Sequence, residues 1–187
     1  LIVFFSVTSA FLAGGVIASL GSLYGASHQK VITFVSFIIG QGLMVVPLVI
    51  YLKFKKISII NSIRLKTLKY TAVWSIVLFS LGLIVLSDEL DRIIQVYIPA
   101  PEYIVDLNHL LKPESIFGGF LLFFAVVILA PLSEEIIFRG FLQQILEKQW
   151  KDSTQAVLFT ALIFSLIHIN PYWFFQIYVL GVFLGFL

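Results

Sequence analysis

Long apolar runs separated by short polar segments dominate the pattern of this chain. Each run carries the near-continuous hydrophobicity of a membrane-spanning helix rather than the one-sided stripe of a soluble helix. A bilayer core needs about 20 apolar residues per helix, so the pattern predicts about six spans. The predicted spans are residues 1–24, 31–52, 70–86, 116–132, 154–169 and 172–187. The predicted fold class is therefore all-α, a polytopic membrane helix bundle.

Composition supports the prediction of a membrane protein and excludes some kinds of chemistry. The chain has 187 residues, of which 60% are hydrophobic, and a mean hydropathy of +1.06, values of an integral membrane protein. It has no cysteine, which excludes disulfides and a thiol nucleophile. It begins without Met and stops inside an apolar run, as expected of a fragment. We divide it into N-terminal spans with an outer loop, residues 1–114, and a core truncated at its C-terminus, residues 115–187.

The distribution of charge predicts the orientation of the spans. Residues 53–69 carry six Lys or Arg residues and no acid, whereas residues 88–114 carry six acids against two bases. By the positive-inside rule the first segment is cytoplasmic and the second lies outside. We expect a multi-pass protein of the bacterial plasma membrane.

Charged residues interrupt the fourth apolar run at Ser133-Glu134-Glu135-Ile136-Ile137-Phe138-Arg139-Gly140. Charges among spans are costly and are usually retained for a function. Glu135 and Arg139 are four residues apart, the spacing of an intrahelical ion pair, while Glu134 points about 100° away. We predict that Arg139 neutralises Glu135 inside the protein, which leaves Glu134 to face a polar cavity as a general base. The alternative is an ion pair that only fixes helix packing.

His168 ends the fifth predicted span, just before Asn170-Pro171 stops the helix. Taken alone, a histidine at the end of a span is more typical of the membrane interface than of a catalytic site. However, Glu134 lies 16 residues before Trp150, where a turn is expected, and His168 lies 18 residues after it. At about 1.5 Å per residue, antiparallel helices would bring the two to similar depth. This requires the fourth helix to continue through Pro131 and Arg139 to about residue 148. A glutamate and a histidine that converge can activate water for hydrolysis.

Together these motifs resemble a known family. Glu134-Glu135-x-x-x-Arg139-Gly140, Phe164-x-x-x-His168 and Gly181-x-x-x-Gly185 are similar to the CPBP family of CAAX prenyl endopeptidases, bacteriocin-processing proteins and abortive-infection proteins. The resemblance covers residues 117–187. It implies a helical bundle with a cavity reached from the cytoplasm.

The resemblance also implies roles for the motif residues. Glu134 and His168 would activate the attacking water, and Glu135 and Arg139 would hold the site's geometry. A further His and Asn are expected in a span beyond residue 187.

The cofactor and partners follow from the same resemblance. A divalent metal such as zinc is a candidate cofactor, with Glu134 and His168 as ligands, although a metal-free mechanism is also argued for the family. Two side chains do not decide between these mechanisms, because a catalytic zinc takes three protein ligands. The expected partners are a peptide or protein substrate, lipidated or embedded in the membrane, and membrane lipid. Nucleic acid is not among them.

Two other functions fit parts of the pattern. The first is a catalytically silent bacteriocin-immunity or partner-binding protein on the same scaffold. The second is a transporter or proton-coupled channel in which Glu134, Arg139 and His168 form a relay. The chain lacks Gly-x-Ser-x-Gly, His-Glu-x-x-His and Gly-x-Gly-Asp, which excludes the other intramembrane protease classes on motif grounds.

Overall fold

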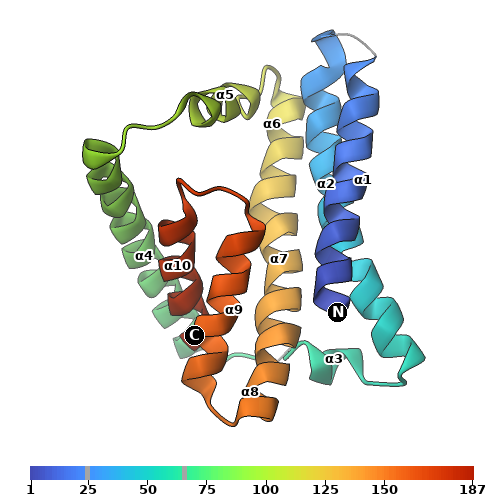
Figure 1. Ribbon diagram of the computed structural model, residues 1–187, viewed down its shortest axis with the longest axis vertical. Coiled ribbons are helices and arrows are strands. Elements are labelled where there is room, and N and C mark those ends of the chain that lie inside the picture. The colour runs from blue at the N-terminus through green and yellow to red at the C-terminus, as the bar shows by residue number, and fades with distance from the viewer. Residues whose placement is uncertain (24–25, 65–66) are drawn as a thin grey trace. The chain divides into compact units, whose positions relative to one another are not determined.

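Every regular element in the part of the chain that the structure, a computed structural model, describes is a helix (Figure 1). That part comprises residues 1–23, 26–64 and 67–187, without the side chains of residues 22, 26–28 and 107–110. The helices are α1 (Ile2–Ser22), α2 (Ala26–Phe54), α3 (Ile59–Ser62), α4 (Tyr70–Tyr97), α5 (Glu102–Leu110), α6 (Ile116–Phe123), α7 (Ala130–Glu135), α8 (Gln144–Trp150), α9 (Ser153–Ile167) and α10 (Phe174–Phe186), with π-helical segments η1 (Phe124–Leu129) and η2 (Ile136–Gln143).

The predicted all-α membrane fold is confirmed. Within the described residues, four helices are long and apolar enough to cross a bilayer. They are Ile2–Gly21, Gln29–Phe54, Tyr70–Tyr97 and Ile116–Trp150. The apolar helices α9 and α10 are shorter. The protein is thus an integral, multi-pass membrane protein, for which about six spans are plausible.

The helix that contains the third predicted span is longer than the span itself. The predicted span ends at residue 86, and α4 continues to Tyr97 through the first acids of the predicted outer segment. Arg92 pairs with Asp88 at 3.0 Å and with Glu89 at 3.5 Å, on the same helix face. Such i,i+3 and i,i+4 pairs stabilise a helix beyond its apolar part.

The chain forms two compact units, each built from two separate stretches. Unit 1 comprises Leu1–Ile63 and Glu102–Phe141, and unit 2 comprises Arg64–Pro101 and Leu142–Leu187. Both units therefore include residues from either side of position 114. The division at this position, into N-terminal spans (1–114) and a core (115–187), stays a prediction about function.

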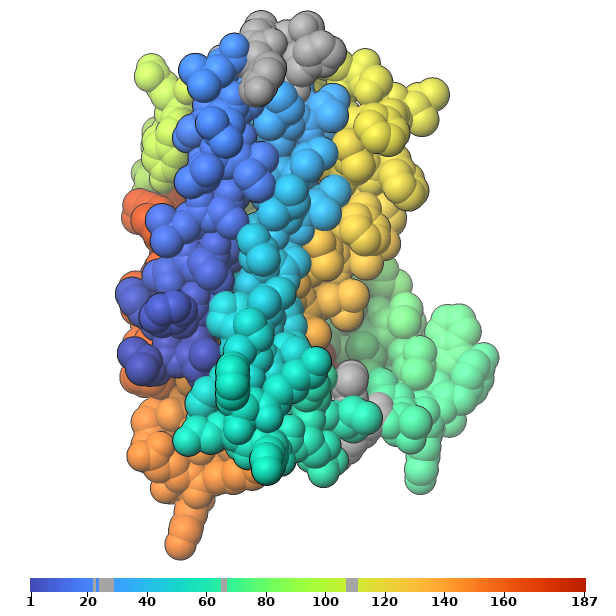
Figure 2. Space-filling model, turned by 90° about the vertical axis from the view of Figure 1, so that its right-hand side faces the viewer, coloured from blue at the N-terminus to red at the C-terminus, as the bar shows by residue number. Residues whose placement is uncertain are grey.

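Unit 1 is built around an α1–α2 hairpin. A Cβ on Gly40 would lie 3.1 Å from the backbone oxygen of Ala10, so the absence of a side chain lets the two helices approach closely. Figure 2 shows α1 and α2 side by side, with the yellow and orange residues of α6 and α7 along the edge of α2. Phe34 is buried in this unit and contacts the helix surface at Gly118.

Unit 2 contains the hairpin of α9 and α10, joined to α4. A Cβ on Gly181 would lie 3.2 Å from Cβ of Ala161, and a Cβ on Gly185 would lie 2.7 Å from Cγ1 of Val157. The Gly181-x-x-x-Gly185 stripe is therefore the surface on which α10 packs against α9. The ring of Phe183, also on α10, meets Phe79 of α4 edge to face, with centroids 6.2 Å apart.

Candidate active site

The acidic motif lies on a helix that widens on both sides of it. Glu134 and Glu135 end α7, Pro131 lies in its first turn, and the π-helical segments η1 and η2 precede and follow it. Proline removes a backbone donor and clashes with the preceding turn of an α-helix, so the wider turns allow the helix to continue. The continuation required by the sequence argument is confirmed, since one helix runs from Ile116 to Trp150.

Backbone contacts hold this helix in unit 1. Oγ of Ser133, which is buried, donates to the backbone oxygen of Gln41 on α2 at 3.0 Å. On the motif's other side, a Cβ on Gly140 would lie only 2.9 Å from the backbone oxygen of Ile63. Gly140 therefore has a steric role, because a side chain would push away the turn after α3. Sequence analysis assigned no role to Ser133 or Gln41, although each is polar within an apolar run.

The Glu135–Arg139 pair forms as the spacing predicts, but the buried member is different. Nε of Arg139 lies 3.7 Å from Oε2 of Glu135. The Arg139 side chain is 9% exposed and that of Glu135 is 55% exposed, so the prediction of a buried carboxylate is wrong. Arg139 lies in η2 beside fully buried Ile137 and Phe138, and the helix turns its guanidinium inward with them. Glu134 is half-buried.

His168 occupies the C-cap of α9 in unit 2. Its Nδ1 lies 2.7 Å from the backbone oxygen of Phe164, and the two rings meet edge to face with centroids 4.7 Å apart. A carbonyl oxygen only accepts, so Nδ1 carries the proton and the lone pair of a neutral ring is on Nε2. Phe164 thus supplies both a backbone acceptor and a ring contact, which accounts for the Phe-x-x-x-His spacing.

The ends of α9 follow local sequence signals. The predicted turn near Trp150 is confirmed, with Lys151 at a left-handed φ of 56° and Asp152 Oδ1 accepting from the backbone N of Gln155 at 3.0 Å. At the other end, the helix stops before Asn170-Pro171 as predicted. The side chain of Asn170 accepts from the backbone N of Tyr172 at 3.1 Å and forms a turn typical of asparagine.

A polar clamp in unit 2 holds the last turns of the long helix that ends at Trp150. The sequence analysis did not predict it. The clamp comprises Arg64, Gln143, Glu147 and the backbone oxygen of Gly185. Nε2 of buried Gln143 donates to Glu147 Oε1 and to the oxygen of Gly185, both at 2.9 Å. The guanidinium of Arg64 donates to both carboxylate oxygens of Glu147. The clamp ties α8 to α10 and to the segment before α4.

Glu134 belongs to unit 1 and His168 to unit 2, and their convergence stays a prediction. Among the described residues, no three His, Asp or Glu side chains are grouped so that they could hold a metal ion. The metal cofactor stays a prediction as well.

Comparison with known proteins agrees with the motifs. Residues 116–187 match the family described as type II CAAX prenyl endopeptidase Rce1-like. The predicted resemblance to the CPBP family is confirmed. The chain is also 27% identical over 161 residues to UPF0177 protein YajF of Lactococcus lactis subsp. lactis (strain IL1403), an alignment that covers 84% of this chain and 73% of YajF. No solved structure matches it.

Proposed function

We propose that this protein is an intramembrane endopeptidase that hydrolyses a peptide bond with a water molecule activated by Glu134 and His168. The observation that supports this best is the match of residues 116–187, which contain both motifs, to a family of prenyl endopeptidases. The substrate is then a peptide or protein that is lipidated or embedded in the membrane.

The side chains suit the steps of hydrolysis. The Glu134 carboxylate takes a proton from water while Nε2 of His168 accepts the water's other hydrogen bond. The water oxygen attacks the peptide carbonyl carbon, and the carbonyl electrons move to its oxygen. When this intermediate collapses, the C–N bond breaks and the proton passes from Glu134 to the leaving nitrogen. Each proton and electron pair is accounted for without a further reactant.

The other two motif residues have positioning roles in this proposal. The buried Arg139 guanidinium places a fixed positive charge one helical turn from the two glutamates. This charge stabilises Glu135, its ion-pair partner, and favours the ionised form that Glu134 needs as a base. The hydrogen bond from Nδ1 of His168 to Phe164 holds the imidazole so that Nε2 is the accepting nitrogen.

A non-additivity test addresses the shared role of Glu134 and His168. Groups that act as one unit lose activity together, so Glu134→Gln and His168→Ala should each lower the cleavage rate by about 10²–10⁴-fold. The double variant should be little slower than either. The measurement uses the natural full-length protein in vesicles, with a prenylated CAAX peptide and extracted membrane peptides as substrates and mass spectrometry of new C-termini.

Glu102→Gln is the matched control, because this glutamate is exposed and lies outside both motifs. It should retain the parent's cleavage rate. Full cleavage by folded Glu134→Gln or His168→Ala would contradict the enzymatic proposal and favour an immunity or partner-binding function. Losses that multiply in the double variant would instead separate the roles of the two residues.

A further inference from the structure

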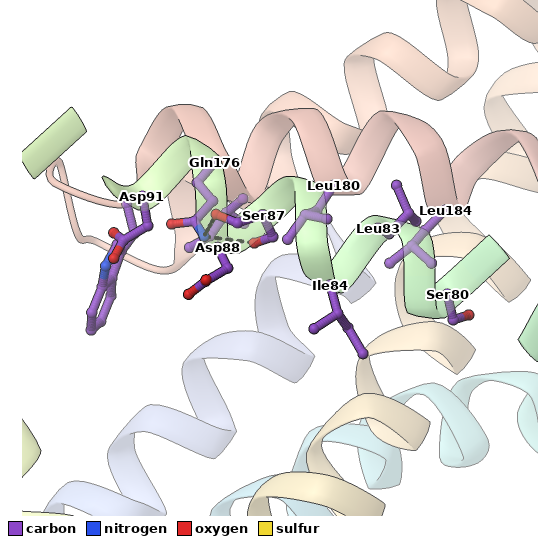
Figure 3. A pocket seen from close by; sticks show the side chains of 11 residues that line it. Ser80, Leu83, Ile84, Ser87, Asp88, Asp91, Gln176, Leu180 and Leu184 are labelled. Carbon is purple, nitrogen blue, oxygen red and sulfur yellow. Dashed lines mark hydrogen bonds between the residues drawn. The ribbon is translucent and has the colours of Figure 1, made fainter. Parts of the chain in front are cut away.

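A groove of about 610 Å³ lies in unit 2 between α4 and α10. This volume is typical of a small-molecule site. Figure 3 shows Leu83, Leu180 and Leu184 toward one end of the groove, and Asp88 and Asp91 toward the other. The motifs assigned to proteolysis contribute none of the groove's lining residues. It is therefore a separate feature that needs its own explanation.

At the polar end of the groove, one carboxylate oxygen can still accept a hydrogen bond. Asp88 pairs with Arg92 at 3.0 Å. Asp91 accepts from Gln95 through Oδ2 at 2.5 Å, but its Oδ1 accepts no hydrogen bond from the residues that the structure describes and is shielded from solvent. Asp91 lines the groove, and so does the indole of Trp173. A carboxylate beside an aromatic ring is suited to an ammonium group.

The remainder of the groove suits a hydrocarbon chain. Between Asp91 and Ser80, at the other end, α4 advances by about 16 Å at the usual helical rise. The amide nitrogen of Gln176 is already engaged, because Nε2 donates to the backbone oxygen of Ser87 at 3.1 Å and to its Oγ at 2.6 Å. A peptide laid against leucine and isoleucine side chains would bury backbone groups without partners, whereas an acyl chain has none to satisfy.

We propose that this groove binds one membrane lipid whose headgroup carries an ammonium, and that it disfavours anionic lipids. The acyl chain lies along Ile84 and Leu180, and the ammonium lies at Asp91. The negative charge at this end selects the headgroup, since a second anion beside Asp91 would be repelled. The proposal does not depend on the proteolytic function.

Fluorescence quenching of Trp173 tests the proposal directly. The natural full-length protein, with Trp74 and Trp150 replaced by phenylalanine, is reconstituted in phosphatidylcholine vesicles. Phosphatidylethanolamine or phosphatidylglycerol with brominated acyl chains is then added as the quencher. Phosphatidylethanolamine should quench at about fivefold lower mole fraction than phosphatidylglycerol, the size of effect expected of one partly exposed charge pair. High salt should reduce this preference.

Asp91→Asn should abolish the preference for phosphatidylethanolamine. Glu89→Gln, which removes the same charge from a neighbouring residue outside the groove lining, should retain it. Equal quenching by both lipids, a preference that salt does not change, or equal effects of the two variants would overturn the proposal. Displacement of the brominated lipid by an apolar peptide with a terminal lysine would reassign the groove to a peptide and also overturn it.

Discussion

Single side chains in the candidate site are oriented by the backbones of nearby helices. Nδ1 of His168 donates to the carbonyl of Phe164, and Ser133 donates to the carbonyl of Gln41. Donation to a carbonyl is the usual way to satisfy a polar group in a membrane helix, where water is scarce.

Because Arg139 rather than Glu135 is buried, a substitution at Glu135 removes the ion-pair partner of a buried charge. Because Arg139 is 9% exposed, Glu135→Gln should leave a buried cation short of its counter-ion and lower the free energy of unfolding by about 1–3 kcal/mol. Adding Arg139→Met should recover part of the loss, since the charge is then removed as well. Denaturant unfolding of the four proteins in detergent measures the coupling.

Glu134→Gln is the control for that cycle, because it changes the neighbouring carboxylate in the same way. It should leave stability within about 0.5 kcal/mol of the parent. Additive losses from Glu135→Gln and Arg139→Met would show that the pair is not energetically coupled.

At the scale of elements, close helix approach depends on glycines at particular positions. Gly140 meets the backbone of Ile63, and Gly185 meets the side chain of Val157. A side chain can rotate away from an added methyl group, but backbone that is fixed by its own hydrogen bonds cannot do so without moving a whole segment. Gly140 should therefore tolerate alanine poorly.

Gly140→Ala should lower stability by about 1–3 kcal/mol, because its Cβ would lie 2.9 Å from the Ile63 oxygen. Gly42→Ala is the matched control, since nothing lies within 4 Å of a Cβ there and alanine favours a helix by about 1 kcal/mol. Thermal unfolding in detergent compares them. A Gly140→Ala protein as stable as the parent would mean that the turn after α3 moves freely.

The polar clamp around Gln143 predicts a second effect at this scale. Gln143→Leu removes two hydrogen bonds and leaves the oxygen of Gly185 without this donor, so it should cost about 1–3 kcal/mol. Gln149→Leu makes the same change at an exposed position of α8 and should be nearly neutral. Thermal unfolding and protease resistance of the α8–α10 region provide the readouts. Equal stability of both variants would remove the clamp's energetic role.

At the scale of the whole molecule, charge asymmetry predicts the orientation in the membrane. Residues 53–69 have bases without acids, and residues 88–114 are mostly acidic; of the basic set, Lys66 lies outside the described residues. Ser58 and Glu102 are exposed in these two segments and suit single-cysteine labelling, since the chain has no cysteine. Reagent added outside intact cells should label Glu102→Cys but not Ser58→Cys. The opposite pattern would invert the topology.

The sequence by itself determined the features that depend on neighbours along the chain. The length of the apolar runs predicted the spans, and the i,i+4 spacing of Glu135 and Arg139 predicted their contact. Asn170-Pro171 predicted where α9 ends, because proline restricts the residue before it. The motifs predicted the family resemblance that the comparison found over residues 116–187. Each of these signals lies within a few residues or within one helix, so no distant partner was needed.

Tertiary structure alone decided the features that join segments far apart in the sequence. The pattern could not show that the arginine rather than the glutamate is buried, because burial depends on what packs around each side chain. It could not show that Gly140 faces Ile63, or that Gln143 bonds to Gly185. These contacts form only when separate helices meet, and they determine which residues support the candidate site.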